Sequence, residues 1–358
     1  MDKLNNKKAF IAAISASQGP EFKYNEQAIL EDYNIQGKNK SSLTIKILTI
    51  IGGFLATLAF IAFLLFAGLY RSEAGLLIFG SFFIIIAIWL NTAYDTLIID
   101  TFSVSSYIIG FVLLAIGLAQ MEIDMNIVTI VISITALISL FITQNYILSF
   151  ISILTITSNF LILIIFNNLY DLIHLYIVIT TLLLTYVFLN EARLITAGLK
   201  LSKLYNPSRI GLIIALLFGL IAIGKRYLIP ISERHIWLPS IVMFCVIMYL
   251  AHLILAINKI ETLKSKILIY TLSCLMLLPL TFSPSILGAI IIILLSFLVN
   301  YKTGVAIGII SFIYFISQYY YDLSFTLLTK SIILFSSGIV FLLFYLFTSK
   351  LPHSNEKI

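Results

Sequence analysis

Long apolar runs separated by short polar segments dominate the sequence from about residue 45 to residue 348. The runs are continuously apolar rather than alternating, which excludes β-barrel strands and predicts membrane-spanning α-helices. A span needs about 20 mostly apolar residues, at about 1.5 Å each, to cross a hydrocarbon core of about 30 Å. The pattern predicts twelve spans, near residues 45–69, 75–91, 103–121, 126–143, 146–166, 171–190, 208–224, 237–257, 266–282, 284–300, 303–321 and 327–348.

Two divisions between neighbouring runs, at Gln144–Asn145 and at Ser283–Pro284, are only one or two residues long. Either place is also consistent with a kinked helix or a re-entrant pair, so the range is ten to twelve spans. The fold prediction is an all-α polytopic bundle. It divides the chain into an N-terminal segment with two small helices (1–44), a transmembrane helical domain (45–348) and a tail (349–358).

Composition agrees with a membrane protein, since 61% of the residues are hydrophobic and only 11% are charged, against about 25% charged in soluble proteins. The net charge of +6 does not indicate nucleic acid, because the basic residues gather beside the apolar runs and form no basic stripe. Cys245 and Cys274 each lie inside an apolar run, which excludes a disulfide framework. The expected surroundings are the lipid bilayer, with no nucleic acid and no cofactor.

The distribution of lysine and arginine predicts the orientation of the bundle. If the N-terminus is cytoplasmic and all twelve spans are present, 17 of the 22 basic residues lie on the cytoplasmic side. This excess favours an even number of spans, with both termini in the cytoplasm.

Two loops carry unusual groups of basic residues. The segment 190–206 is basic and has leucines at helical spacing, which predicts an interfacial helix that meets anionic headgroups or, alternatively, docks a cytoplasmic partner. The loop 225–236 is predicted outside the cell, yet it holds Lys225, Arg226 and Arg234. These three side chains either snorkel to lipid phosphates or capture an anionic ligand or partner.

The stretch from Tyr319 to Lys330 has the densest mixture of aromatic, acidic and basic residues in the chain. The tyrosines, which include Tyr320 and Tyr321, are typical of an aromatic belt at a membrane interface. Asp322 and Lys330 are placed to pair if the connector between the last two runs turns back. The stretch is therefore a candidate partner surface on the extracytoplasmic face.

The predicted spans hold almost no ionisable groups, and the candidate polar residues inside them are Asn159 and His252. Each fits either a hydrogen-bonded packing residue or a functional group, such as a proton relay at His252. Small residues form two further patterns that permit close helix contact, Gly304 with Gly308, and Gly52 with Ala56 and Ala59.

Catalytic motifs are missing from the sequence. The four histidines do not have HExxH spacing, and there is no GxSxG, phosphate-binding glycine loop or dinucleotide turn. Asp95 and Asp100 are too few to make a metal site on their own. An enzyme would need them to converge with His174 or His235, which the predicted topology places on the opposite side. We therefore expect no catalytic activity.

The C-terminal run YYYDLSFTLLTKSIILFSSG resembles the ending of a bacterial membrane family, domain of unknown function 4401. The matching residues are Tyr320, Tyr321, Leu327, Leu328, Lys330, Ser331 and Gly338, and the segment from Ser42 to Ala56 resembles the first span of the family. The resemblance implies a multi-pass protein of the bacterial inner membrane with no assigned activity. It also implies a partner, a membrane-anchored protein named for a GDYXXLXY motif.

Two classes of function fit these observations. The first is a non-catalytic component of a membrane complex, which acts with a partner on its extracytoplasmic face. The second is a secondary transporter or lipid flippase, whose binding site would be a polar cavity at mid-membrane. The sequence identifies neither the substrate nor the oligomeric state.

Overall fold

The computed structural model describes residues 43–68, 71–94, 97–143, 145–224, 230, 235–258 and 262–322, with six isolated residues between 328 and 342. The two predicted N-terminal helices, the tail and most of the twelfth predicted span lie outside the described residues.

Every regular element in this part of the chain is helical, which confirms the all-α fold. The elements are α3 (Leu43–Phe66), α4 (Glu73–Ala93), α5 (Leu97–Gln120), α6 (Met125–Ile142), α7 (Tyr146–Phe166), α8 (Leu172–Leu189), α9 (Glu191–Thr196), α10 (Leu199–Gly224), α11 (Trp237–Ile257), α12 (Leu263–Leu277), a 3₁₀ turn (Pro279–Phe282), α13 (Pro284–Leu298) and α14 (Lys302–Asp322).

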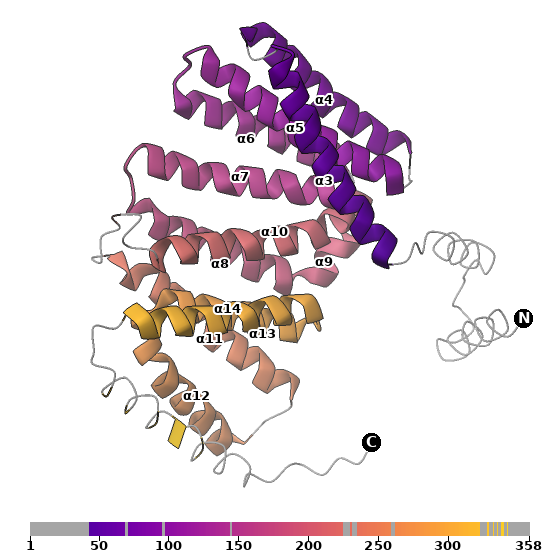
Figure 1. Ribbon diagram of the computed structural model, residues 1–358. Helices are drawn as coiled ribbons and strands as arrows, with labels where there is room; N and C mark the ends of the chain where they lie inside the picture. The colour runs from indigo at the N-terminus through magenta and orange to yellow at the C-terminus, as the bar shows by residue number, and fades with distance from the viewer. Residues whose placement is uncertain are drawn as a thin grey trace, which may run out of the picture.

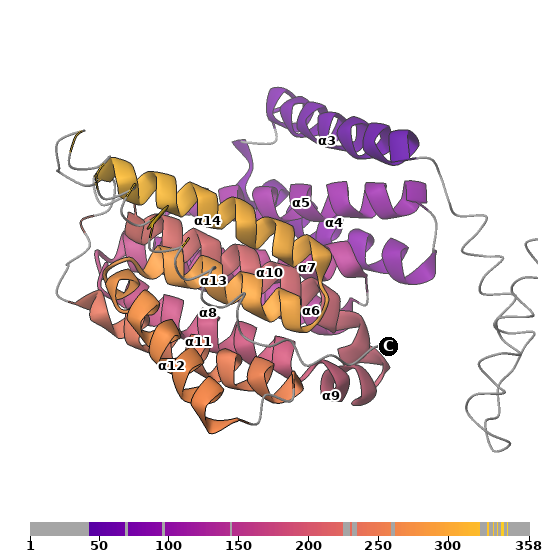
Figure 2. The same ribbon diagram turned by 90° about the horizontal axis from the view of Figure 1, so that it is seen from below.

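The helices are stacked in groups that broadly follow the order of the chain, except that α12 rather than α14 lies at the far side (Figure 1). Helices α3 to α6 lie at one side of the bundle, α7, α8 and α10 in the middle, and α11 to α14 at the other side. The view turned by 90° shows α3 at the outer edge of its side, next to α5 (Figure 2). Helix α10 is central, because it packs against α7, α8, α9, α13 and α14.

Eight helices in the described part are long and apolar enough to cross a membrane, which makes the chain a helical membrane protein by length and composition. They are α4, α5, α6, α7, α8, α10, α11 and α14. Six of them begin and end within two residues of the predicted runs, whereas α5 begins at Leu97, six residues before the run predicted from residue 103. The total of twelve spans and the cytoplasmic placement of both termini stay predictions.

The eighth helix, α10, shows where the prediction is wrong. The interfacial helix predicted over 190–206 is divided between the short α9 and the first part of α10, which continues through Pro207 rather than beginning at residue 208. The break between them falls at Gly198, whose φ of +148° a residue with a side chain rarely adopts. Proline removes one backbone donor within a helix, and here it does not end α10.

The region predicted as the spans 266–282 and 284–300 also differs. Helices α12 and α13 have 15 residues each, so each is about 22 Å long and shorter than the hydrocarbon core. The 3₁₀ turn and Pro284 separate them, so the short division at Ser283–Pro284 is real. Helix α12 packs on α11, whereas α13 packs on α8, α10, α11 and α14.

Glycines allow two of the helix pairs to pack closely. A Cβ atom on Gly80 of α4 would lie 2.8 Å from the backbone nitrogen of Leu114 and 3.0 Å from the carbonyl oxygen of Gly110, both in α5. Gly304 and Gly308 face α13 in the same way, which confirms close contact at this motif. Gly52 has no atom within 4 Å of such a Cβ position, so no described residue makes the close contact that this glycine permits.

Side chains of three neighbouring helices donate hydrogen bonds to backbone carbonyl oxygens of α10. The bonds run from Tyr176 of α8 to Ala215 (3.1 Å), from Ser285 of α13 to Leu220 (3.1 Å) and from Gln318 of α14 to Gly224 (2.6 Å). In hydrocarbon a polar group has no water to bond, so these pairs fix the neighbours around α10.

The close approach of α4 and α5 predicts the effect of one methyl group. Gly80→Ala should destabilise the protein by about 1–3 kcal/mol, because the new Cβ meets backbone atoms that move only with the whole helix. Gly52→Ala is the matched control, and it should be neutral or slightly stabilising because the space is open and alanine favours a helix. Thermal unfolding of the detergent-purified variants would measure both, and equal melting temperatures would contradict the packing described here.

Candidate functional site

The structure brings together the beginnings of the two predicted partner surfaces. The side-chain amide nitrogen of Gln318 donates to the carbonyl oxygen of Gly224 over 2.6 Å. Gly224 is the last residue of α10, and the basic loop that begins with Lys225 follows it directly. Gln318 lies immediately before the three tyrosines. One hydrogen bond therefore joins the starting points of the 225–236 loop and the Tyr319–Lys330 stretch.

Local physical chemistry explains why this junction forms. The last carbonyl groups of a helix have no partner within the helix, and at Gly224 the amide of Gln318 supplies the donor. Gln318 leaves no room for a side chain at Gly224, because an added Cβ would lie 2.5 Å from its amide nitrogen. Phe315, one turn earlier in α14, is buried in the main core and holds this helix against the bundle.

The tyrosines that follow Gln318 are partly or fully accessible. Tyr321 is 76% exposed, and its ring lies edge-on to that of Tyr320 with 5.8 Å between the centroids. Asp322 is the last residue of α14, and Lys330 lies outside the described residues. The pairing of Asp322 with Lys330 therefore stays a prediction, while the exposed rings fit both a membrane belt and a partner surface.

The far end of the basic loop is fixed at the turn between α7 and α8. The Nδ1 atom of His235 lies 3.6 Å from a carboxylate oxygen of Asp171. The ring of His235 also lies 6.4 Å, centroid to centroid, from the buried His174. Lys225, Arg226 and Arg234 themselves lie outside the described residues. Sequence reasoning missed Asp171, because only the fold brings this carboxylate to the end of the loop.

The two candidate polar residues inside the spans both hydrogen-bond to a neighbouring helix. Asn159 of α7 is 7% exposed and donates to the hydroxyl of Ser133 in α6 over 3.0 Å. His252 of α11 shares a hydrogen bond of 2.8 Å with the hydroxyl of Tyr270 in α12, at the surface of the bundle. Each side chain ties one helix to the next, and neither lines a described pocket.

Asp100 does not converge with His174 or His235, and Asp95 lies outside the described residues. Asp100 bonds to Asn145, just before α7 begins, whereas His174 and His235 lie beyond the end of α7. This helix has 21 residues, so about 30 Å separates the two groups. Among the described residues, no group of three His, Cys, Asp or Glu side chains could hold a metal ion.

Arg209 marks the end of the bundle opposite the Gln318–Gly224 junction. Its guanidinium lies 3.6 Å from the ring centroid of Tyr301, donates to Asn206 over 2.8 Å, and lies 3.9 Å from a carboxylate oxygen of Glu191. Only 12% of its side chain is exposed. A cation held over an aromatic face in this way ties α10 to the turn between α13 and α14.

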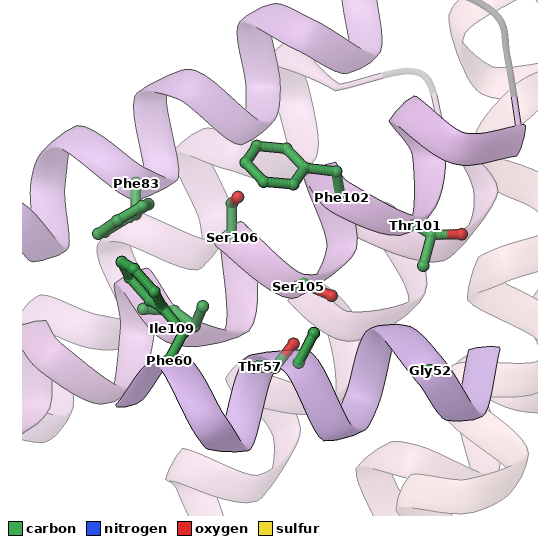
Figure 3. A pocket seen from close by; sticks show the side chains of 10 residues that line it. Gly52, Thr57, Phe60, Phe83, Thr101, Phe102, Ser105, Ser106 and Ile109 are labelled. Carbon is green, nitrogen blue, oxygen red and sulfur yellow. The ribbon is translucent and has the colours of Figure 1, made fainter. Parts of the chain in front are cut away.

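A pocket of about 490 Å³ opens at the side of the bundle, between α3 and α5 (Figure 3). Phe60 and Phe83 lie together at one end of it, with 5.6 Å between their ring centroids. The hydroxyl-bearing residues Thr57, Ser105 and Ser106 contribute to its lining. The walls are therefore mainly apolar, with a few polar groups, as is typical of small-molecule sites.

These features define a helical membrane protein whose polar sites lie at the ends and one side of a packed bundle. The chain belongs to the family described as domain of unknown function DUF4401, whose family model matches residues 42–351. The family resemblance seen in the sequence is thereby confirmed. No curated protein and no solved structure matches the chain.

Proposed function

We propose that the protein is a non-catalytic component of a complex in the bacterial cytoplasmic membrane. Its partner binds the extracytoplasmic end of the bundle, where the loop after Gly224 and the tyrosines after Gln318 begin side by side. The hydrogen bond between Gln318 and Gly224 carries the proposal, because it joins the two residues that immediately precede these sequence features. The partner is a membrane-anchored protein of the GDYXXLXY type.

The chemistry of this end supports a protein partner. Tyrosine and arginine are the residue types that contribute most binding energy at protein interfaces. Here Tyr320 and Tyr321 start one stretch, and Arg226 and Arg234 belong to the other. Basic side chains on the extracytoplasmic face run against the usual charge distribution of membrane proteins. A partner with acidic residues would compensate them.

The described interior of the bundle supports a non-catalytic role, and it also supports a protein that carries no substrate through its centre. The core of α8, α10, α11 and α13 is apolar and includes the fully buried Leu184, Ile213, Leu216 and Ile292. Asn159 and His252, which could have marked a path, bond to neighbouring helices instead. The described polar groups with potential for binding therefore lie at the ends and side of the bundle.

Chemical crosslinking and co-purification from bacterial membranes in mild detergent would test the proposal. We expect the wild-type chain to retain a membrane-anchored partner, and the double variant Tyr320→Ala/Tyr321→Ala to lose most of it. Gln318→Glu should reduce retention as well, because it replaces the amide donor to Gly224 with a carboxylate. Replacing Asp322 and Lys330 by Ala, singly and together, tests the rest of the stretch.

Two controls separate partner loss from unfolding. Tyr186→Ala removes an exposed tyrosine of α8, and Gln120→Glu makes the same amide-to-acid change at the end of α5. Both variants should retain the partner. Purification of the wild-type chain alone after crosslinking, or full retention by the tyrosine double variant, would contradict the proposal.

The lateral pocket favours a lipid flippase or carrier as the second candidate. It combines apolar walls with hydroxyl groups and lies at the side of the bundle, so an amphipathic molecule could enter from the bilayer. Ala56→Trp would fill it from α3, and in reconstituted vesicles this variant should abolish transbilayer movement of a fluorescent phospholipid. Ala59→Trp on the same helix is the control. Vesicles in which the wild-type chain moves no lipid would exclude this candidate.

A further inference from the structure

A polar pocket of about 330 Å³ lies at the end of the bundle opposite the Gln318–Gly224 junction. Five segments contribute to it: Asn91 lies near the end of α4, Asp100 near the start of α5, Ile142 at the end of α6, Asn145 just before α7, and Lys203 in the first part of α10. The described residues of the pocket therefore include one carboxylate, one ammonium and two amides, from segments far apart in the sequence.

Asp100 is held in place by both amides. The Nδ2 atoms of Asn91 and Asn145 donate to the same carboxylate oxygen, over 2.9 Å and 3.2 Å. The amide oxygen of Asn145 accepts hydrogen bonds from the backbone N–H groups of Ile147 and Leu148 at the start of α7. Because this cap fixes which end of the amide is the acceptor, its NH₂ group must face Asp100. The carboxylate of Asp100 is therefore held in a defined position within the pocket.

Exposed aromatic and apolar side chains place the pocket at the level of the lipid headgroups. Trp89 and Tyr94, at the end of α4, pack edge to face with 6.4 Å between their ring centroids. Both are largely exposed, at 59% and 49%, and exposed Trp and Tyr at a helix end are typical of a membrane interface. Tyr94 also lines the pocket, as does the exposed Ile142 of α6.

We propose that this pocket binds the headgroup of a zwitterionic phospholipid with a primary ammonium, the phosphatidylethanolamine class. The ammonium binds Asp100 and the phosphate binds Lys203. A purely anionic headgroup would meet the carboxylate of Asp100, and a simple cation would meet Lys203. A headgroup that carries both charges complements both residues, and Ile142 extends the site toward the acyl chains. This site is independent of the proposed partner surface.

The two tryptophans of the chain make a direct test possible. Trp237→Phe leaves Trp89, beside the pocket, as the one tryptophan in the full-length protein. The variant is placed in nanodiscs of phosphatidylglycerol. Brominated phosphatidylethanolamine should then quench the fluorescence of Trp89 at a mole fraction about threefold lower than brominated phosphatidylglycerol needs, because exposed charge contacts contribute free energies of this size. Brominated phosphatidylcholine should be weaker than phosphatidylethanolamine, because its ammonium has no N–H donors.

Charge variants in this background assign the effect to the pocket. Lys203→Gln and Asp100→Asn should each remove the preference for phosphatidylethanolamine, and Lys203→Arg should keep it. Lys200→Gln removes a basic residue one turn earlier in α10 and should change nothing. Lys203 is exposed, so its variants should fold even if Asp100→Asn does not, and circular dichroism would check this.

Soluble phosphoethanolamine distinguishes a lipid source from a free one. A soluble ligand would show two results together. Phosphoethanolamine would change Trp89 emission in a saturable way that requires Lys203, and no brominated lipid would be preferred. That outcome would mean that the pocket recognises the same headgroup chemistry in a free molecule, and it would contradict the lipid proposal. Equal quenching by all three lipids, with no effect of phosphoethanolamine, would overturn the site itself. A preference that survives Lys203→Gln would also overturn it.

Discussion

The arrangement of the bundle depends on hydrogen bonds donated to the backbone of α10. Side chains from α8, α13 and α14 each bond to a carbonyl oxygen of this helix, at positions spread from Ala215 to Gly224. Interhelical hydrogen bonds in membrane proteins contribute about 0.6 kcal/mol on average and up to about 1.7. Their larger effect is on register, because an amide or hydroxyl displaced into hydrocarbon finds no water. The apolar core around α10 then packs in one arrangement.

Helix α10 also connects the interior of the bundle with polar groups at both ends of the bundle. The bond to Gly224 joins the residue that precedes the basic loop to the residue that precedes the tyrosines. At the other end, the first part of α10 carries Lys203 into the polar pocket and Arg209 onto the ring of Tyr301. One helix therefore positions the candidate partner surface and the candidate headgroup site, which lie at opposite ends of the bundle.

The pattern of apolar runs predicted most of the helices, because burial in lipid needs little more than length and apolar character. It failed where local chemistry mattered more. Pro207 lies inside α10, although proline commonly ends helices. The apolar stretch around Pro284 continues through two helices too short to be full spans. Gly52 looked like a packing glycine, yet it faces the lateral pocket.

The candidate sites were predictable only where they are local in sequence. The tyrosines and the basic loop stand out by composition alone, whereas the bond that joins them links Gln318 to a residue 94 positions earlier. The sequence presents Asp100 only as one of two acids that are too few for a metal site, because nothing in it links Asp100 to Asn145, 45 residues away. No periodicity or motif encodes such pairs, and only the packing of α4, α5, α7 and α10 reveals them.

Amide hydrogen exchange of the full-length protein in nanodiscs, read by mass spectrometry, tests the central position of α10 most directly. The account predicts that peptides from α10 between Ala215 and Gly224 exchange more slowly than those of α12, which packs on α11 at the edge of the bundle. It also predicts that Tyr176→Phe speeds exchange around Ala215, while Tyr186→Phe at an exposed position of the same helix does not. Equal exchange in α10 and α12, or no response to Tyr176→Phe, would contradict it.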